Sequence, residues 1–228
     1  MDDKKTLTRV RVWDLPTRIF HWALAIGVIA LGVTGTVGSF NAMVWHFRLG
    51  YAVLTLLMFR IGWGLVGGRW SRFGAFIYSP RTVIDYFKGK GEPAHAAGHS
   101  PIGAWSVFAM LALLLAQVAS GLVSDDKGST GPLSRFVSNS AVSLASNYHA
   151  NIGKWLLLAL VLLHVVAVVY YLLRKQNLVG AMLHGDKDLV VALPSSRDDA
   201  ASRIGALAVL LVCAGVAYWI SSLDVVAG

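Results

Sequence analysis

The sequence is poor in cysteine and in charge. Cys213 is the one cysteine among 228 residues, and it stands inside an apolar run. A disulfide framework, a thiolate metal cluster and a C-x-x-C-H motif for covalent haem attachment are therefore excluded. Charged residues make up 14% of the chain and hydrophobic residues 56%, whereas soluble domains are about a quarter charged. This composition predicts an integral membrane protein with one membrane domain.

Long apolar runs are the main feature of the chain. A membrane-spanning helix needs about 20 apolar residues. Four runs reach this length and another, the second, is broken by Arg60; in order they are residues 18–37, 44–66, 102–123, 149–173 and 204–222. We therefore expect an all-α integral membrane protein, with a bundle of four transmembrane helices and a fifth, C-terminal transmembrane helix. The expected division is a four-helix domain over residues 1–190 and a C-terminal extension over residues 191–228.

Basic residues are concentrated in alternate connecting segments. They precede the first run, follow the second and follow the fourth, whereas the remaining segments hold only Arg48, Lys127, Arg135 and Lys154. By the positive-inside rule this asymmetry predicts a cytoplasmic N-terminus and, with five spans, a C-terminus outside the cytoplasm. The formal net charge of +8 is explained by the same asymmetry, so no nucleic-acid partner is expected.

The segments between the runs carry three further expectations. Residues 38–43 are so few that the first two helices must be antiparallel neighbours. Residues 79–88 have a serine suited to the N-cap and a proline at the first helical position, with Val83, Ile84 and Phe87 on one face, which predicts a helix on the membrane surface. Residues 124–147 are rich in Ser, Gly and Asn and are expected to cap the outer end of the bundle.

Four of the seven histidines lie in the spanning runs. His21 is near the cytoplasmic start of the first run and His46 is near the outer start of the second. His149 is at the outer start of the fourth run, and His164 lies about 22 Å further along that helix. Depth therefore pairs His46 with His149 at an outer level and His21 with His164 at an inner level, because the crossed pairs would be separated by most of the membrane.

Each pair of imidazoles can supply both axial ligands of a haem iron. A haem with both axial positions filled carries electrons and binds oxygen poorly. Gly50 and Gly153 follow His46 and His149 by one helical turn on the same face, where a side chain would collide with a porphyrin. The pattern favours two non-covalent haem groups, each held by two histidines.

Haem propionates need cations nearby. Arg48 and Lys154 flank the outer pair of histidines, and two further arginines lie near the inner pair. Arg60 lies about 21 Å deeper than His46 on nearly the same helix face, at the level of the inner haem. Arg18 is one turn from the inner ligand on the first run. Gln117 and Ser120 in the third run would bond either a haem substituent or another helix.

These residues also have structural interpretations. A single histidine in a span can hydrogen-bond to another helix, Arg60 can extend its charged end to the interface, and the glycines can be helix-packing positions. We expect His95 and His99 to be solvated, or at most to serve the inner haem edge or the mouth of a quinone site. His184, which follows the fourth run, is expected at the membrane interface.

Five segments together resemble a known family. They are VRVWDLPTRIFHW around His21, WHFRLGYAVL around His46, GHSPIGAW around His99, YHANIGKWLLLALVLLHVVAVVYY around His149 and His164, and NLVGAMLHGDK after it. The combination is similar to the bacterial b561-type cytochrome family, which includes the cytochrome b subunits of nickel-iron hydrogenases. The resemblance covers residues 9 to about 190.

The resemblance implies a four-helix bundle in the bacterial inner membrane that holds two non-covalent haems b. It implies that the ligands are His21, His46, His149 and His164; we single out no catalytic side chain. Such proteins pass electrons between membrane quinones and a redox partner, often a cytochrome c or a dehydrogenase or hydrogenase subunit. The fifth helix departs from the family pattern, which leaves the partner open, and a homodimer is left open too.

Two other functions remain as alternatives. A superoxide:quinone oxidoreductase of the same fold would need a cationic outer surface to steer the anion, and the few outer cations are offset by Asp125, Asp126 and Asp224. A haem-free divalent-metal transporter would gather its ligands with carboxylates near one level of the membrane. The histidines here stand at two levels, and no aspartate or glutamate lies inside a predicted span.

Overall fold

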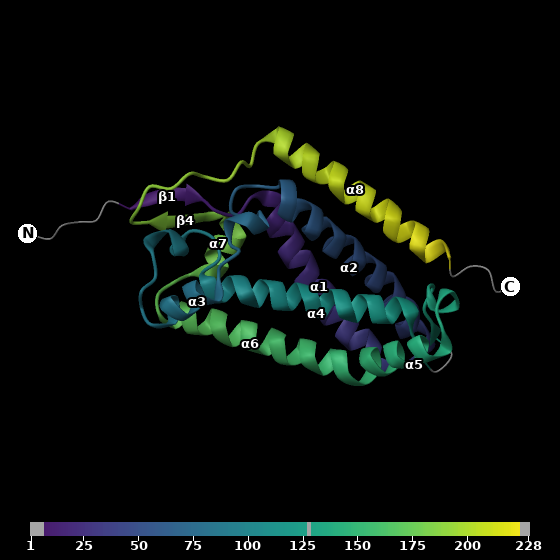
Figure 1. The fold of residues 1–228 in the computed structure, drawn as a ribbon. Coiled ribbons are helices and arrows are strands. Elements are labelled where there is room, and N and C mark those ends of the chain that lie inside the picture. The colour runs from purple at the N-terminus through teal and green to yellow at the C-terminus, as the bar shows by residue number, and fades with distance from the viewer. Residues whose placement is uncertain (1–6, 127–128, 224–228) are drawn as a thin grey trace, which may run out of the picture. The chain divides into compact units, whose positions relative to one another are not determined.

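The computed structural model describes residues 7–126 and 129–223. Within these residues five helices are long and apolar enough to cross a membrane, as Figure 1 shows. They are α1 (Leu15–Val37), α2 (Phe40–Val66), α4 (Pro101–Val123), a continuous helical segment over Asn139–Leu173, and α8 (Ala200–Ser222). The predicted all-α membrane fold is therefore confirmed. Four charged residues that bear on the predicted orientation and on the predicted outer surface lie outside the described residues: Lys4, Lys5, Lys127 and Asp224.

Shorter elements connect the long helices. Helical segments are Phe73–Ala75, α3 (Pro80–Phe87), Pro93–Ala96, Ser134–Phe136 and α7 (Leu178–His184). Strands are β1 (Thr8–Arg11), β2 (Asp125–Asp126), β3 (Ser129–Thr130) and β4 (Asp186–Leu189). The strands form two antiparallel pairs, β1 with β4 and β2 with β3. They were not predicted, because the longer pair joins segments from opposite ends of the sequence.

The described chain falls into two compact units. Of the described residues, unit 1 comprises 7–20, 60–109 and 164–207, and unit 2 comprises 21–59, 110–126, 129–163 and 208–223. The division cuts through the long helices and does not follow the expected boundary at residue 190. Each unit has its own apolar core.

In unit 1 the N-terminal strand is held by two segments from the other end of the sequence. β1 pairs with β4 in the register Thr8↔Leu189 to Arg11↔Asp186, and the two strands lie side by side in Figure 1. Residues 194–198, which we call the strap, run along the end of β1. The amide of Ser196 donates to the carbonyl of Arg11 at 2.7 Å, and its hydroxyl donates to the carbonyl of Val12 at 2.8 Å.

The strap ends at a carboxylate shared by three arginines. Asp198 contacts Arg11 at 2.6 Å, Arg203 at 3.2 Å and Arg18 at 3.7 Å, and it accepts the backbone N–H of Leu15 at 3.1 Å. Burial alone would raise the pKa of Asp198, but the Leu15 amide and the guanidinium groups of Arg203 and Arg11 hold that pKa below its ordinary value. The segment before α8 is therefore fixed to the start of α1 by charge.

This arrangement predicts a pH dependence of stability. A carboxylate whose pKa is lowered on folding stabilises the folded state above its unfolded pKa of about 3.9 and loses that contribution as the pH falls through the folded pKa. We expect the thermal unfolding midpoint in detergent to fall between about pH 5 and pH 3, and to fall less steeply in Asp198→Asn. Equal slopes for the two proteins would contradict the assignment, and the exposed Asp188 of β4, changed to Asn, provides the matched control.

A second carboxylate of unit 1 is fully buried. Asp14 accepts hydrogen bonds from the amide of Thr17 at 2.8 Å, the amide of Gly68 at 3.1 Å, the hydroxyl of Ser71 at 3.0 Å and the indole of Trp63 at 3.3 Å. The Thr17 contact is an N-cap for the first turn of α1. The other three donors come from the end of α2 and the segment after it, so Asp14 joins the start of α1 to the end of α2.

The core of unit 2 is formed by leucine and valine side chains of three helices. Val53 and Leu57 of α2, Leu114 of α4, and Leu157 of α6 (Lys154–Leu173) are buried together. In this unit α1 and α2 are joined by only two residues, Gly38 and Ser39, and Gly38 has the positive φ of 67° that a tight reversal requires. The connection is shorter than the six residues predicted.

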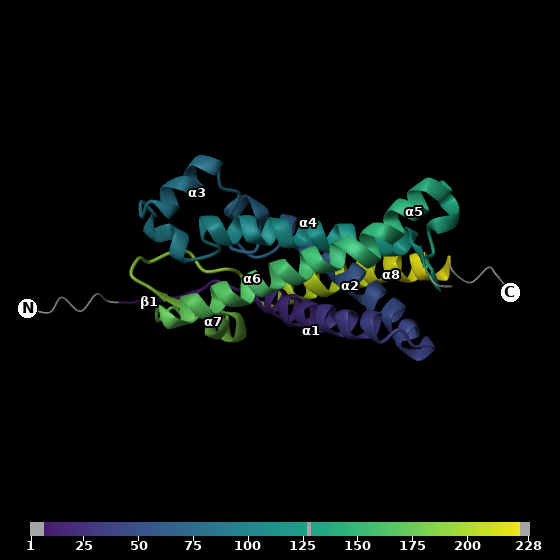
Figure 2. The same ribbon diagram turned by 90° about the horizontal axis from the view of Figure 1, so that it is seen from below.

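Two local predictions need correction. The helix over residues 79–88 is present as α3 with Ser79 capping the amide of Thr82, but Val83 is buried whereas Ile84 and Phe87 are exposed, so the three do not share one environment. The segment 124–147 is not all loop, because residues 139–147 form helix α5 (Asn139–Asn147). Figure 2 shows α5 running into the longer helix that follows.

Candidate functional site

Two of the four predicted ligands meet within unit 2. The ring centres of His46 and His149 are 6.1 Å apart and the ring planes are at 89° to each other. Two imidazoles bound to one metal atom would have ring centres roughly 6 Å apart, because a metal–imidazole bond is about 2 Å long and the nitrogen lies about 1 Å from the ring centre. The separation therefore fits two axial ligands of one iron, as the depth argument predicts for the outer pair.

Both rings are held by the nitrogen that faces away from such a metal. Nδ1 of His46 lies 3.2 Å from the hydroxyl of Thr34 on α1. Nδ1 of His149 lies 2.8 Å from the backbone carbonyl of Gln117 on α4 and 3.4 Å from the hydroxyl of Ser120. A carbonyl can only accept, so Nδ1 of His149 carries the proton and Nε2 keeps its lone pair. Such anchoring fixes the tautomer and ring direction of metal-binding histidines.

Glycines make room for these rings on the facing helices. A Cβ atom on Gly35 would lie 3.0 Å from Cε1 of His46, and one on Gly121 would lie 2.7 Å from Cε1 of His149. Gly50, predicted to clear space for a macrocycle, has nothing within 4 Å of a Cβ position. Gly153, predicted for the same purpose, instead lies against the side chains of Gln117 and Tyr148.

The predicted inner ligands fall in different units. His21 belongs to unit 2, where its ring makes an edge contact with Trp22 at 5.2 Å. His164 belongs to unit 1, on the exposed side of α6. Each lies in a membrane-spanning helix, as expected. Their pairing stays a prediction.

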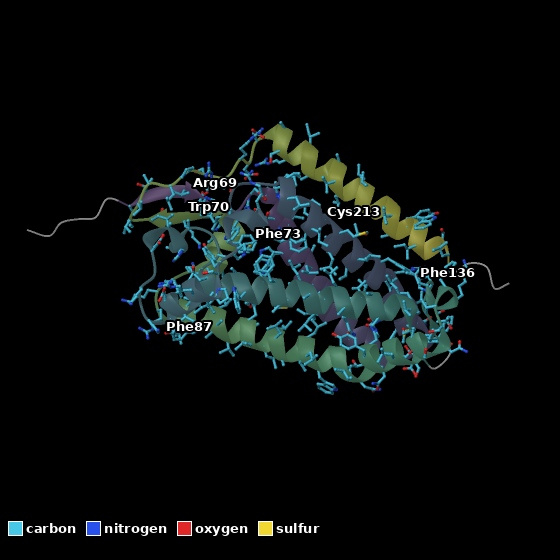
Figure 3. All side chains as sticks on the ribbon, in the orientation of Figure 1. Arg69, Trp70, Phe73, Phe87, Phe136 and Cys213 are labelled. Atoms are coloured by element: carbon cyan, nitrogen blue, oxygen red, sulfur yellow. The ribbon has the colours of Figure 1, made fainter. Side chains whose placement is uncertain are left out.

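The two arginines predicted to serve propionates have protein partners in unit 1. Arg60 is 4% exposed, donates to the carbonyl of Ser71 at 3.0 Å, and lies over the ring of Phe73 at 4.7 Å. Figure 3 labels Phe73 in the segment that follows α2. Arg18 donates to the carbonyl of Leu183 at 2.7 Å. A role toward a propionate stays a prediction for both residues.

The histidines outside the spans are not all solvated. The ring of His99 is half-buried and packs in tilted contact against Trp13 and Phe76, with ring centres 4.7 Å and 4.3 Å apart, so the expectation that it faces water is wrong. His95 is also half-buried, and its Nδ1 accepts the amide of Glu92 at 3.1 Å. His184 is exposed. The aromatic rings that enclose His99 come from distant parts of the sequence, which no local pattern reveals.

Two positioning residues were missed by sequence reasoning. Thr34 and Gly121 touch the ligand rings, yet neither was singled out. The short reversal at Gly38 and Ser39 is a usable signal for Thr34, because residues at similar distances from a tight reversal face each other across antiparallel helices. No comparable signal marks Gly121, since its partner helix follows a long connection.

Comparison with known proteins identifies the family of this chain. Residues 12–185 match the family model described as prokaryotic cytochrome b561. The chain is 24% identical over 212 residues to a probable Ni/Fe-hydrogenase B-type cytochrome subunit of Rhizobium leguminosarum bv. viciae, covering 78% of this chain and 88% of the relative. It is 24% identical over 217 residues to a probable Ni/Fe-hydrogenase B-type cytochrome subunit of Rhodobacter capsulatus, with coverages of 79% and 82%.

The family match includes all four predicted ligand histidines and both halves of the ring pair described above. It extends over much more than half of the chain and stops before the strap and α8. The relatives are described as b-type cytochrome subunits, which is consistent with the family match. The chain therefore belongs to the prokaryotic cytochrome b561 family, whose members are membrane electron-transfer proteins that hold haem b.

Proposed function

We propose that this protein is a cytochrome with two haems b that carries electrons between membrane quinone and a redox partner. The outer haem is bound by His46 and His149, and the inner haem by His21 and His164. The observation that supports this most directly is the 6.1 Å separation of the His46 and His149 ring centres at perpendicular planes. The anchored Nδ1 atoms agree with it, because they leave both Nε2 atoms for iron.

The residues of the outer site hold the cofactor and exclude water. Haem supplies the one-electron chemistry when bound. His46 and His149 fix the iron from two helices, Thr34 and the carbonyl of Gln117 hold the two rings in place, and Gly50 leaves open space one turn from His46. The apolar core of the same unit keeps the surroundings at low polarity, which is one of the factors that set a haem potential.

The partner proposed is a hydrogenase or another dehydrogenase. Its support is the similarity of this chain to proteins described as probable Ni/Fe-hydrogenase B-type cytochrome subunits. Because the family match ends at residue 185, we assign residues 1–190 to the haem domain and residues 191–228 to an extension with the fifth helix. The extension is the part in which partner specificity is expected to differ from that of the relatives.

We place the protein in the bacterial inner membrane with its N-terminus in the cytoplasm. Of the 17 lysine and arginine residues that the structure describes, all but Arg48, Arg135 and Lys154 belong to unit 1. That unit includes the segments before α1, between α2 and α4, and between α6 and α8. The positive-inside rule assigns such segments to the cytoplasm and the C-terminus to the periplasm.

Purified full-length protein, produced with ample haem, tests the proposal. We expect a b-type reduced-minus-oxidised spectrum, two haems per chain, two redox steps in a potentiometric titration, and oxidation of the reduced protein by a soluble quinone analogue. A colourless protein, or one haem per chain, would refute the two-haem assignment. Haem reduction by superoxide faster than the spontaneous background would favour superoxide:quinone oxidoreductase activity instead.

A further inference from the structure

The helix that carries His149 is not regular around that residue. Residues Tyr148–Gly153 form a π-helical turn between α5 and α6. In such a turn the backbone hydrogen bonds span five residues in place of four, and π-turns are rare and frequent at functional sites. The turn therefore rotates the side chains that precede it about the helix axis, relative to the side chains that follow it.

Gln117 on α4 contacts His149 at two points. Its backbone carbonyl lies 2.8 Å from Nδ1 of the imidazole, and its side-chain amide donates to the backbone carbonyl of His149 at 3.0 Å. The orientation of the amide is fixed by this second contact, because the reversed orientation would place two oxygens together. One residue of α4 therefore holds both the ring and the backbone of His149.

Gly153, at the end of the π-turn, makes this double contact sterically feasible. A Cβ atom on Gly153 would overlap the side-chain oxygen of Gln117 and would lie 2.7 Å from the ring of Tyr148. Gly153 is itself buried, so a side chain at this position would be directed against these neighbours and not into solvent. Any side chain at position 153 would displace the amide from the carbonyl of His149.

We propose that Gln117, together with Gly153 and the π-turn, is the positioning residue for the haem ligand His149 and sets the angle between the two imidazole planes. The inference rests on the proposed function, since it assumes that His46 and His149 bind the outer haem. Gln117 does not touch the iron. It acts through His149 by holding the ligand perpendicular to His46, at the observed 89°.

The angle between two axial imidazoles has a spectroscopic signature. Each axial imidazole splits the energies of two iron d orbitals, in a direction set by its ring plane. When the two ring planes are perpendicular, the two splittings oppose each other and cancel. A ferric low-spin haem with perpendicular ligands therefore gives a strongly anisotropic electron paramagnetic resonance signal, with a large highest g value. A rotation of His149 toward the plane of His46 lowers that value.

The test uses full-length protein loaded with haem. Gln117→Met keeps the length and helix propensity of the side chain but removes the donor, and Gly153→Ala keeps the amide but displaces it. In both variants the backbone carbonyl of Gln117 still accepts from Nδ1 of His149, but the amide no longer holds the His149 backbone. We therefore expect the ring of His149 to rotate and the highest g value of the outer haem to fall. The double variant should add little, as expected of residues that act as one unit.

Thr55→Val and Gly32→Ala are the matched controls. The hydroxyl of Thr55 bonds to the carbonyl of Tyr51 in its own helix, and Gly32 has nothing within 4 Å of a Cβ position, so neither should change the g values.

The outcomes separate this inference from the proposed function. Unchanged g values in Gln117→Met with the outer haem bound would refute the positioning role and leave haem ligation intact. Loss of the outer haem alone would support the positioning role. If Gln117→Met lost both haems, Gly153→Ala would decide, with unchanged g values refuting the role. A wild-type protein without a b-type spectrum would refute the proposed function itself.

Discussion

Replacing His46 by alanine is expected to remove the same haem that replacement of His149 removes. The two rings stand 6.1 Å apart with their Nδ1 atoms anchored on separate helices, so each supplies one side of a single iron. Loss of either ligand leaves the iron with an open axial position. Haem content should fall from two to one per chain in both variants, and the same redox step should disappear from the titration.

The complementary variants test the whole assignment. His21→Ala and His164→Ala should each remove the other redox step and keep the one that His46→Ala abolishes. His184→Ala is the control, because His184 is exposed and lies outside the spans, and it should retain both haems. Loss of different steps from His46→Ala and His149→Ala would show that the two residues bind different irons.

Replacing Asp14 by alanine is expected to give the largest loss of stability. The carboxylate is fully buried and accepts four hydrogen bonds from the start of α1, the end of α2 and the segment that follows. Its removal leaves buried donors without an acceptor and takes away the N-cap of α1. Each buried donor left without an acceptor costs about 1 to 3 kcal/mol, and four donors lose theirs here, which should appear as a large fall in the thermal unfolding midpoint in detergent.

Two further variants make this result interpretable. Asp14→Asn retains an acceptor oxygen and should lose less stability than Asp14→Ala. Asp188→Ala, an exposed carboxylate on β4, should leave the midpoint nearly unchanged. If Asp14→Ala and Asp188→Ala had equal midpoints, the buried carboxylate would not join α1 to α2 as described.

The long helices were predictable because their physical cause is local. Each spanning run is a continuous apolar sequence, so composition alone locates it to within a few residues, as with α4 predicted at 102–123 and observed at Pro101–Val123. The strand pair of Thr8 to Arg11 with Asp186 to Leu189 was not predictable. Nothing in four residues specifies a partner that lies far away in the sequence.

The ligand histidines of the site were predictable from the sequence, but the residues that position their rings were not. His46 and His149 were identified because a polar side chain stands out in an apolar run. They were paired because both are predicted to lie at the same depth in the membrane. Thr34 was missed because threonine is common in spans and bonds to its own helix, as it also does here to Ala30. The π-turn at Tyr148–Gly153 was missed because a regular 3.6-residue period was assumed throughout the helix.

The pairing of β1 with β4 has a consequence for the order of folding. During synthesis Thr8 leaves the ribosome long before Leu189, its partner in the ladder, and domains assemble as their segments emerge. Strand β1 therefore has no partner strand during the time in which four hydrophobic helices are inserted into the bilayer. Closure of this ladder is then a late event in biogenesis, and a ribosome stalled before residue 186 would leave an inserted protein whose leading strand is still accessible to protease.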